Sequence, residues 1–303
     1  GTLSDIAFKV NQRRGLTMKI FSLKKELDEL KNQIFVSKKI GFFLGAGTSM
    51  SLGIPGITKL TDNVKEELSS DIKEVYDKVE KSLESCLPES SNTIEDILNH
   101  IRLIRKITNN LGDKSFDNIS GKEAKKLDLE ICNTIYNIIS IEEQSINLTI
   151  TNKFFSWLNW LDKDFTKEIF TTNYDLIFEK SLESMQIPFF DGFVGANEPF
   201  FLPKSIEFNN KYEKAPISWI RLWKIHGSFG WFWKKNSENE TFKVVRLGVM
   251  AKDSQEKNEL VIYPSREKYE LSRKQPFTAY FDRLKNYLHK GEGLFIINGY
   301  SFS

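Results

Sequence analysis

Short apolar segments that end in glycine or small polar residues constrain the fold of this 303-residue chain more than any other feature. Ile40–Leu44 is such a run, and Leu294–Asn298 is a second; a glycine follows each. Short apolar runs of this kind are typical of strands buried in a parallel sheet. Glu168–Thr172, Trp219–Ile225 and Val261–Tyr263 are further predicted strands. Because helical segments alternate with them, we expect an α/β fold with a parallel sheet and helices on both faces.

Amphipathic patterns predict helices between the strands. Apolar residues recur every three or four positions over Leu16–Phe35, so we expect residues 1–37 to form an N-terminal helical segment. A second helix is predicted over Asp175–Met185. Thr58 is the expected cap of a helix that follows the first glycine-rich turn.

A long stretch from about residue 60 to residue 163 has only helical character. Thr93 and Asp96 have the spacing of a capping box before an apolar stripe. We expect an all-helical module inserted into a domain that spans residues 38–303. The alternative is a separate helical domain. A second helical stripe within the stretch contains Ala124, Leu127, Ile131, Ile135 and Ile138.

Composition narrows the classes of partner. The net charge is +2, which favours neither nucleic acid nor an anionic membrane as a direct partner. The two cysteines, Cys86 and Cys132, form no CxxC pair, so neither a disulfide framework nor a four-cysteine zinc site is expected. The apolar runs are too short to span a bilayer. We therefore expect a cytoplasmic protein without a bound metal.

The first polar tip, Gly45–Ser49, follows a predicted strand and precedes a helix. Glycines at that position allow the backbone to approach a pyrophosphate, and the N–H groups of a helix start favour anions. Ser49 and Met50 stand where the usual dinucleotide motif has its third glycine. A tight turn that binds no ligand is the alternative.

The second tip, Thr171–Asp175, ends the next predicted strand along the chain. Ligands bind at this edge of an open parallel sheet. The amide of Asn173 can both donate and accept, so it could orient a water or a ribose hydroxyl. Capping of the next helix by Asn173 or Asp175 is the alternative.

Two further tips follow the predicted strands nearer the C-terminus. His226 comes between Ile225 and Gly227-Ser228, at a strand end where a histidine could exchange protons at neutral pH. A structural histidine is the alternative there. Gly299 and Ser301 follow the last strand and suit contact with a ribose or phosphate.

As an ordered set, these tips resemble a known family. GAGTSMSLGIP, TTNYD, KIHGS, IYPSREKY and NGYSF, in this order, are similar to the sirtuin-like domains of bacterial antiphage defence proteins. Those domains belong to the NAD-hydrolysing branch of the silent-information-regulator superfamily. The resemblance covers about Ile40 to the end of the chain. It implies a Rossmann-like sheet with an inserted helical module, and NAD as the substrate between them.

The resemblance also implies roles for individual residues. Asn173 and His226 are the expected catalytic pair at the nicotinamide ribose, and Asp175 is expected to hold the nicotinamide end. The other residues expected to contact NAD are Gly45, Ala46, Gly47, Thr48, Ser49, Pro55, Thr172, Gly227, Gly299 and Ser301. No role follows for the segment Ile262–Ser265.

A biological setting follows from the same resemblance. We expect an NAD hydrolase that releases nicotinamide and ADP-ribose and serves as the effector of an antiphage system. We also expect a homo-oligomer, with further C-terminal domains after Ser303 or a second defence protein as partner.

Two departures from protein-deacylating sirtuins favour hydrolysis. The chain has no four-cysteine zinc ribbon, and Gly56-Ile57-Thr58 follows GIP where those enzymes have Asp-Phe-Arg. An NAD-dependent deacylase stays an alternative, as does a non-catalytic module that senses NAD or ADP-ribose.

Overall fold

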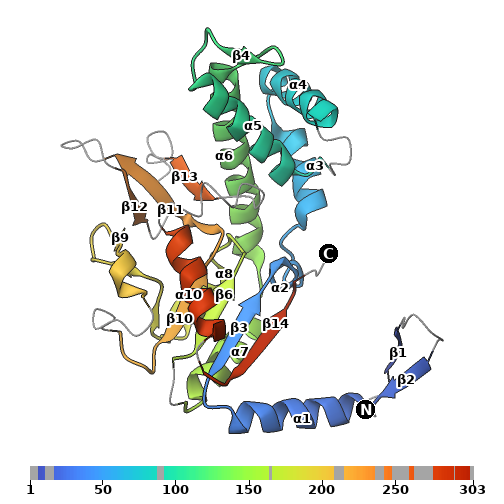
Figure 1. The fold of residues 1–303 in the computed structure, drawn as a ribbon, viewed down its shortest axis with the longest axis vertical. Helices are drawn as coiled ribbons and strands as arrows, with labels where there is room; N and C mark the ends of the chain where they lie inside the picture. Colours follow the sequence, from blue (N-terminus) through green and yellow to red (C-terminus); the bar gives the residue numbers. More distant parts are fainter. Residues whose placement is uncertain are drawn as a thin grey trace.

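The computed structural model describes residues 6–10, 17–86, 92–163, 166–207, 215–235, 242–247, 259–262, 276–289 and 291–300. Figure 1 shows a sheet-containing lower part, a group of helices above it and an N-terminal helix that extends to one side.

A five-stranded parallel sheet forms the centre of the lower part, in the order β14-β3-β6-β10-β7. The predicted strands β3 and β14 have the expected bounds, and β6 and β10 agree to within one residue at each end. The bounds are β3 Ile40–Leu44, β6 Glu168–Thr171, β7 Phe189–Phe190, β10 Ile220–Lys224 and β14 Leu294–Asn298.

Successive residues of the sheet pack on opposite faces, as the pleat requires. Phe42 belongs to the core shared with α7 (Thr149–Trp160) and α8 (Ile177–Ser184). Phe170 belongs to the core shared with α10 (Phe277–His289). The parallel sheet with helices on both faces confirms the predicted Rossmann-like α/β fold.

A buried ion pair fixes α10 to the sheet. Both carboxylate oxygens of Glu168 on β6 accept hydrogen bonds from Arg283 on α10, at 2.6 and 2.9 Å. The indole of Trp223 donates to the same carboxylate at 3.0 Å. Glu168 is fully buried and Arg283 nearly so. A buried carboxylate with this many donors remains compatible with folding because its lost hydration is replaced.

A second, antiparallel sheet packs beside the first in the order β13-β11-β12-β9-β8, and the sequence did not predict it. The expectation that the strand at Val261–Tyr263 belongs to the parallel sheet is wrong: β13 pairs antiparallel with β11. The chain turns from β10 into β11 after only two residues, and β11 pairs antiparallel with β12 on one side and with β13 on the other. The bounds are β8 Phe193–Val194, β9 Phe200–Phe201, β11 Gly227–Lys235, β12 Phe242–Arg246 and β13 Glu259–Ile262; a short 3₁₀ helix, Pro203–Ser205, follows β9.

The group of helices above the sheet corresponds to the predicted helical module. It consists of α3 Ile57–Glu67, α4 Ser70–Cys86, α5 Ile94–Thr108 and α6 Gly121–Ser145, with a small hairpin of β4 Ser115–Phe116 and β5 Ile119–Ser120. The hairpin was not predicted. The domain boundaries given by the sequence stay predictions, although α7, inside the predicted insertion, packs on α8 and the sheet.

Local caps fix where these helices start. The predicted capping box of Thr93 and Asp96 is confirmed, and Ser120 and Glu123 form another at the start of α6. Thr58 is not a cap, because α3 already starts at Ile57, with Gly56 at the N-cap position.

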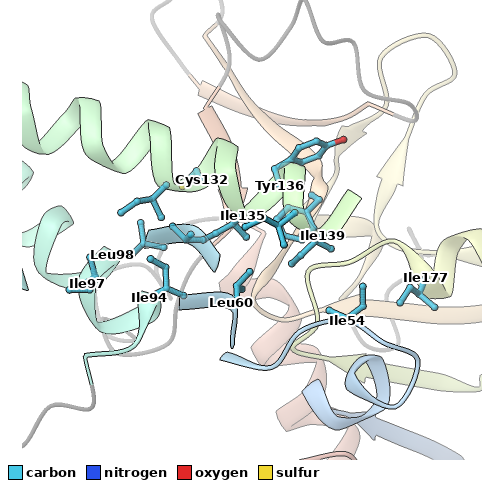
Figure 2. Close-up of a cluster of buried hydrophobic side chains, with 14 of the residues drawn as sticks. Ile54, Leu60, Ile94, Ile97, Leu98, Cys132, Ile135, Tyr136, Ile139 and Ile177 are labelled. Carbon is cyan, nitrogen blue, oxygen red and sulfur yellow. The ribbon is translucent and has the colours of Figure 1, made fainter. Parts of the chain in front are cut away.

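One apolar core continues from the helices to the sheet. Figure 2 shows Ile94 and Ile97 of α5 and Ile135 and Ile139 of α6 in the cluster that also contains Ile54, beside the first glycine-rich turn. This continuity positions the helical module against the ends of the strands.

The N-terminal segment differs from the prediction. The helix α1 covers Leu23–Val36, whereas Thr17–Phe21, expected to be helical, is the strand β2 and pairs with β1 (Ile6–Val10). The alternation of polar Thr17 and Lys19 with apolar Met18 and Ile20 has the period of a strand, although Ile20 also fits a helical stripe.

Candidate functional site

A cavity of about 400 Å³ lies where the carboxyl ends of β3, β6 and β10 face the helical module. The strand ends contribute Asn173 and His226, and the module contributes Glu95. The other lining residues are Phe43, Ala46, Ser49, Met50, Ile54, Pro55, Gly56, Ile57, Leu60, Ile139, Thr172, Tyr174, Asp175, Ile225, Phe281, Leu284 and Tyr300. The cavity is at the sheet edge where ligands of this fold class bind.

The side-chain amide of Asn173 is held by hydrogen bonds to Gly45 and to the short helix α2 (Ala46–Met50), which follow β3. Its Nδ2 donates to Ser49 Oγ at 2.7 Å, to Thr48 Oγ1 at 3.0 Å and to the Gly45 carbonyl at 3.2 Å. Its backbone N–H donates to Thr171 Oγ1 at 3.1 Å. The amide orientation is therefore determined by its surroundings, because every nearby acceptor is on the Nδ2 side.

The other end of the same amide lacks a partner. Asn173 Oδ1 is buried and accepts no hydrogen bond from the residues that the structure describes. A buried carbonyl oxygen left without a donor costs free energy comparable to a lost hydrogen bond. Since Asn173 lines the cavity, a water or a hydroxyl of a ligand is suited to supply that donor.

Ser49 and Asp175 continue the network behind Asn173. Ser49 Oγ donates to Asp175 Oδ2 at 2.7 Å, and Asp175 Oδ1 accepts from the Ile177 N–H at 3.2 Å. Asp175 thus accepts from the first residue of α8, although Leu176 and not Asp175 holds the N-cap position, and it also supports the Asn173 network. The Ser49 hydroxyl both accepts and donates within this network.

His226 lies at the junction of the two sheets, between the last residue of β10 and the first of β11. The N–H of Ile225 donates to the Thr171 carbonyl at 2.9 Å, and the N–H of Phe229 donates to the Tyr174 carbonyl at 3.0 Å. The backbone on both sides of His226 is therefore tied to the segment that carries Asn173. Gly227 permits the turn with a φ of +99°, a value that side chains disfavour.

The two predicted catalytic residues therefore line one cavity. The His226 ring is half-buried, and its centroid is 6.4 Å from that of Tyr174, the residue after Asn173. The structure brings Asn173 and His226 together as the sequence predicted. Their catalytic roles stay predictions.

The glycines of the first turn contact the end of β14. A Cβ on Gly45 would lie 2.5 Å from the Gly299 carbonyl oxygen, and one on Gly47 would lie 2.8 Å from the Gly299 Cα. The N–H of Gly47 donates to the Gly299 carbonyl at 2.8 Å. These glycines allow two backbones to meet, and their contact with a pyrophosphate stays a prediction.

The predicted NAD contacts therefore separate into two groups. Ala46, Ser49, Pro55, Thr172 and Asp175 line the cavity with the catalytic pair. Among the residues that the structure describes, the lining does not include Gly45, Gly47, Thr48, Gly227 and Gly299. Ser301 lies outside the described residues, as do Tyr263–Ser265.

Sequence reasoning missed a buried pair that supports the second tip. Lys224 Nζ, nearly fully buried, donates to the Asp175 carbonyl and forms an ion pair with Glu179 Oε1 at 2.9 Å. Burial raises the pKa of Glu179 to about 7, although Lys224 opposes that rise. Lys224 was visible in the KIHGS motif, but no sequence pattern related it to α8.

Sequence reasoning also missed Glu95, the second residue of α5. It lines the cavity from the module side and is half-buried. Burial raises the pKa of the Tyr174 hydroxyl well above its ordinary value, and the Glu95 charge adds to that rise. The helical pattern gave no signal for Glu95, because acidic residues are common in a first helical turn.

Within the described ranges, no helix combines the length and the apolar character that a membrane span requires. No group of three or more His, Cys, Asp or Glu side chains in the same ranges is arranged to hold a metal ion.

The comparison with protein families gives one match. Residues 167–303 match the family described as SIR2-like domain. The matched region begins just before β6 and contains the Asn173, His226 and Gly299 tips, whereas the Gly45–Ser49 turn precedes it. No curated protein matches the chain. The match supports NAD-related chemistry in the broad sense.

Proposed function

We propose that this chain hydrolyses NAD at the nicotinamide–ribose bond. The single observation that carries the proposal is the buried Asn173 Oδ1, which has no partner among the described residues and lies in a cavity that His226 also lines. Water and oxidised NAD are consumed; nicotinamide, ADP-ribose and one proton are formed. The SIR2-like match over residues 167–303 supports NAD as the substrate.

The chemistry needs a positioned water and a sequestered nicotinamide ribose. As the bond to nicotinamide breaks, positive charge spreads onto the ribose ring, and an enzyme gains rate by stabilising that state over the ground state. In the proposal, Asn173 Oδ1 accepts a hydrogen bond from the water or a ribose hydroxyl and fixes its position. His226 accepts the proton that the water loses.

The cavity walls suit this reaction. Apolar residues from the module, among them Leu60 and Ile139, lie opposite the polar strand ends. Apolar walls exclude bulk water, which strengthens the interactions of the polar groups inside. Asp175 lies on the strand side, where it faces the nicotinamide end in the proposal.

The biological role is a further part of the proposal. We propose that NAD depletion makes this chain the effector of an antiphage system and that it acts in the cytoplasm as a homo-oligomer. The resemblance of the ordered tips to sirtuin-like defence proteins supports this part.

The direct test is chromatography of NAD after incubation with the purified protein. The expected products are nicotinamide and ADP-ribose in equal amounts. His226→Ala should lower kcat by about 10²–10⁴-fold, the usual contribution of a general base. Asn173→Ala should abolish measurable turnover.

His289→Ala is the matched control, because His289 is exposed at the end of α10 and does not line the cavity. This variant should turn over NAD at the same rate as the unmodified protein. Normal NAD consumption by His226→Ala or Asn173→Ala would contradict the assigned roles. Binding of NAD without products would favour a sensing module instead.

A further inference from the structure

The charged groups of the cavity are unevenly distributed. Glu95 and Asp175 are the carboxylates in its lining. Among the described residues, no lysine or arginine lines it. On the strand side, Lys224 is buried behind the second tip, where it binds the Asp175 carbonyl and Glu179. The described part of the lining therefore carries two carboxylates, and Asn173 Oδ1, which has no partner among the described residues, adds a further acceptor.

Glu95 comes from the module and is not required for the start of its own helix. Thr93 and Asp96 complete the capping box of α5 between themselves. Glu95 lines the cavity together with Tyr174, the residue between Asn173 and Asp175, and its charge adds to the rise that burial causes in the pKa of the tyrosine hydroxyl, against an opposing effect of Arg102. Glu95 therefore brings a negative charge to the side of the cavity opposite the strand ends.

We propose that Glu95 is a selectivity residue that makes this cavity favour a cationic ligand over a neutral or anionic one. On the proposed function, on which the identity of the ligand rests, that ligand is the nicotinamide-riboside end of oxidised NAD. The helical module thus contributes to substrate choice as well as to the walls.

The physical reason is the charge difference between closely related nucleotides. The nicotinamide ring of oxidised NAD carries a positive charge, which reduced NAD lacks. ADP-ribose has the same pyrophosphate without the ring. A half-buried carboxylate attracts the positively charged oxidised ring. It gains no such attraction from reduced NAD, whose ring is neutral, or from ADP-ribose, which lacks the ring. Glu95 therefore separates substrate from both its reduced form and its product.

The test measures binding by isothermal calorimetry of oxidised NAD, reduced NAD and ADP-ribose in the slow His226→Ala background, with Glu95 present and with Glu95→Gln added. Chromatography of the cell contents verifies that the nucleotides stay intact during each titration, and turnover is assayed separately with His226 present. Glu95→Gln should weaken oxidised NAD by about three- to tenfold, as expected for loss of one partly buried charge partner. Reduced NAD should change by less than about twofold, and ADP-ribose should bind equally or more tightly.

Glu130→Gln is the matched control: it removes the same charge from an exposed position of α6 outside the cavity lining. It should leave all three affinities unchanged, and thermal unfolding should show that both variants are folded. Glu95→Asp, which keeps the charge, should retain most of the preference for oxidised NAD.

Two results would overturn the inference: an unchanged ratio of oxidised to reduced NAD affinity in Glu95→Gln, or no binding of either nucleotide when Glu95 is present. Hydrolysis of NAD with an unchanged ratio would refute the role of Glu95 and leave the proposed function intact. A lowered ratio in a protein that never hydrolyses NAD would support the role of Glu95 and refute the proposed function.

Discussion

The two walls of the cavity differ in the interactions that hold their residues in place. On the strand side, Asn173, Ser49 and Asp175 are fixed to one another by hydrogen bonds of 2.7 Å. On the module side, Leu60 and Ile139 belong to an apolar core, and Glu95 is the carboxylate that the module adds to the cavity lining. Hydrogen-bonded polar groups define positions, whereas apolar packing supplies most of the folding free energy. The comparison therefore predicts that changes in the module mainly affect stability and changes at the strand ends mainly affect turnover.

The largest effect should come from the module core. Ile97, fully buried on α5, loses its packing in Ile97→Ala, which should lower the free energy of unfolding by about 2–5 kcal/mol. Urea unfolding measures it. Leu103→Ala, on the same helix at a position 39% exposed, should cost less than about 1 kcal/mol. A large loss of kcat per folded Ile97→Ala molecule would contradict the prediction that changes in the module mainly affect stability.

The next effect should come from the strand side. Asn173→Asp keeps the shape but replaces the Nδ2 donor, so the carbonyl facing the cavity loses its fixed orientation and a charge is added beside Asp175. We expect kcat to fall by about 10²–10³-fold, a loss typical of one preorganised polar group. Asn147→Asp is the control, because exposed Asn147 uses its side-chain oxygen, which aspartate retains, to accept from the Thr149 N–H. Equal effects of the two changes would contradict the role of Asn173.

A smaller effect should follow from Ser49→Ala, which removes the hydroxyl between Asn173 and Asp175. One net hydrogen bond is worth about 1 kcal/mol, so kcat should fall by about three- to tenfold. KM should change little, because the amide loses its support and not its contact with the substrate. Ser51→Ala, which removes an exposed hydroxyl bonded to the Thr48 carbonyl, should leave both constants unchanged. A raised KM with normal kcat would make Ser49 a direct substrate contact instead.

The smallest effect concerns pH and lies in the module. His100 is buried and its Nε2 is 2.8 Å from Ser82 Oγ, which donates to Asp117 Oδ2 at 2.6 Å. Burial lowers the pKa of His100 below its ordinary 6.5, against an opposing influence from Asp117. The unfolded chain therefore binds a proton more readily, so stability is complete above about pH 6.5 and falls below it.

The expected loss between pH 7.5 and pH 5.5 is at most about 1.4 kcal/mol, the limit that an unfolded pKa of 6.5 sets. His100→Gln should reduce this loss, whereas His289→Gln, at an exposed position, should keep it. Urea unfolding at both pH values measures the difference. Stability that rises on acidification only when His100 is present would show that the shift has the opposite sign.

The parallel sheet and the polar tips were predictable because their signals are local. Ile40–Leu44 and Leu294–Asn298 are apolar on both faces and end at glycines, and Thr93 with Asp96 has the spacing of a cap. Asn173 and His226 were predictable as partners because each follows a strand of one parallel sheet, whose carboxyl ends share an edge.

The antiparallel sheet was not predictable in the same way. β8 and β9 are two residues long, and β11 is a mixture of aromatic residues and lysines that has no clean alternation. The pairing of β11 with β12 and β13 depends on the turn at Gly227, where the chain leaves the parallel sheet. Periodicity cannot reveal to which sheet a strand belongs.

Glu95 and the contacts of the glycines were hidden for a different reason. Glu95 reaches the cavity only because the apolar core places α5 over the strand ends, and a sequence pattern does not encode that distance. Gly45 and Gly47 were expected to let the backbone approach a pyrophosphate, which stays a prediction; the close neighbour that the structure shows is the backbone of Gly299. A glycine in the sequence indicates that another group approaches the backbone closely, but it does not identify that group.

The backbone hydrogen bonds on either side of His226 limit which features of the site amino-acid substitutions can alter. Main-chain groups at Ile225 and Phe229 join the histidine segment to the asparagine segment, so side-chain substitutions have little power to widen or narrow the separation of the pair. Variation that alters the choice of nucleotide must then arise in the surrounding walls, where residues are exchangeable. The distance between Asn173 and His226 would then stay the same in such variants, because the path of the backbone determines it.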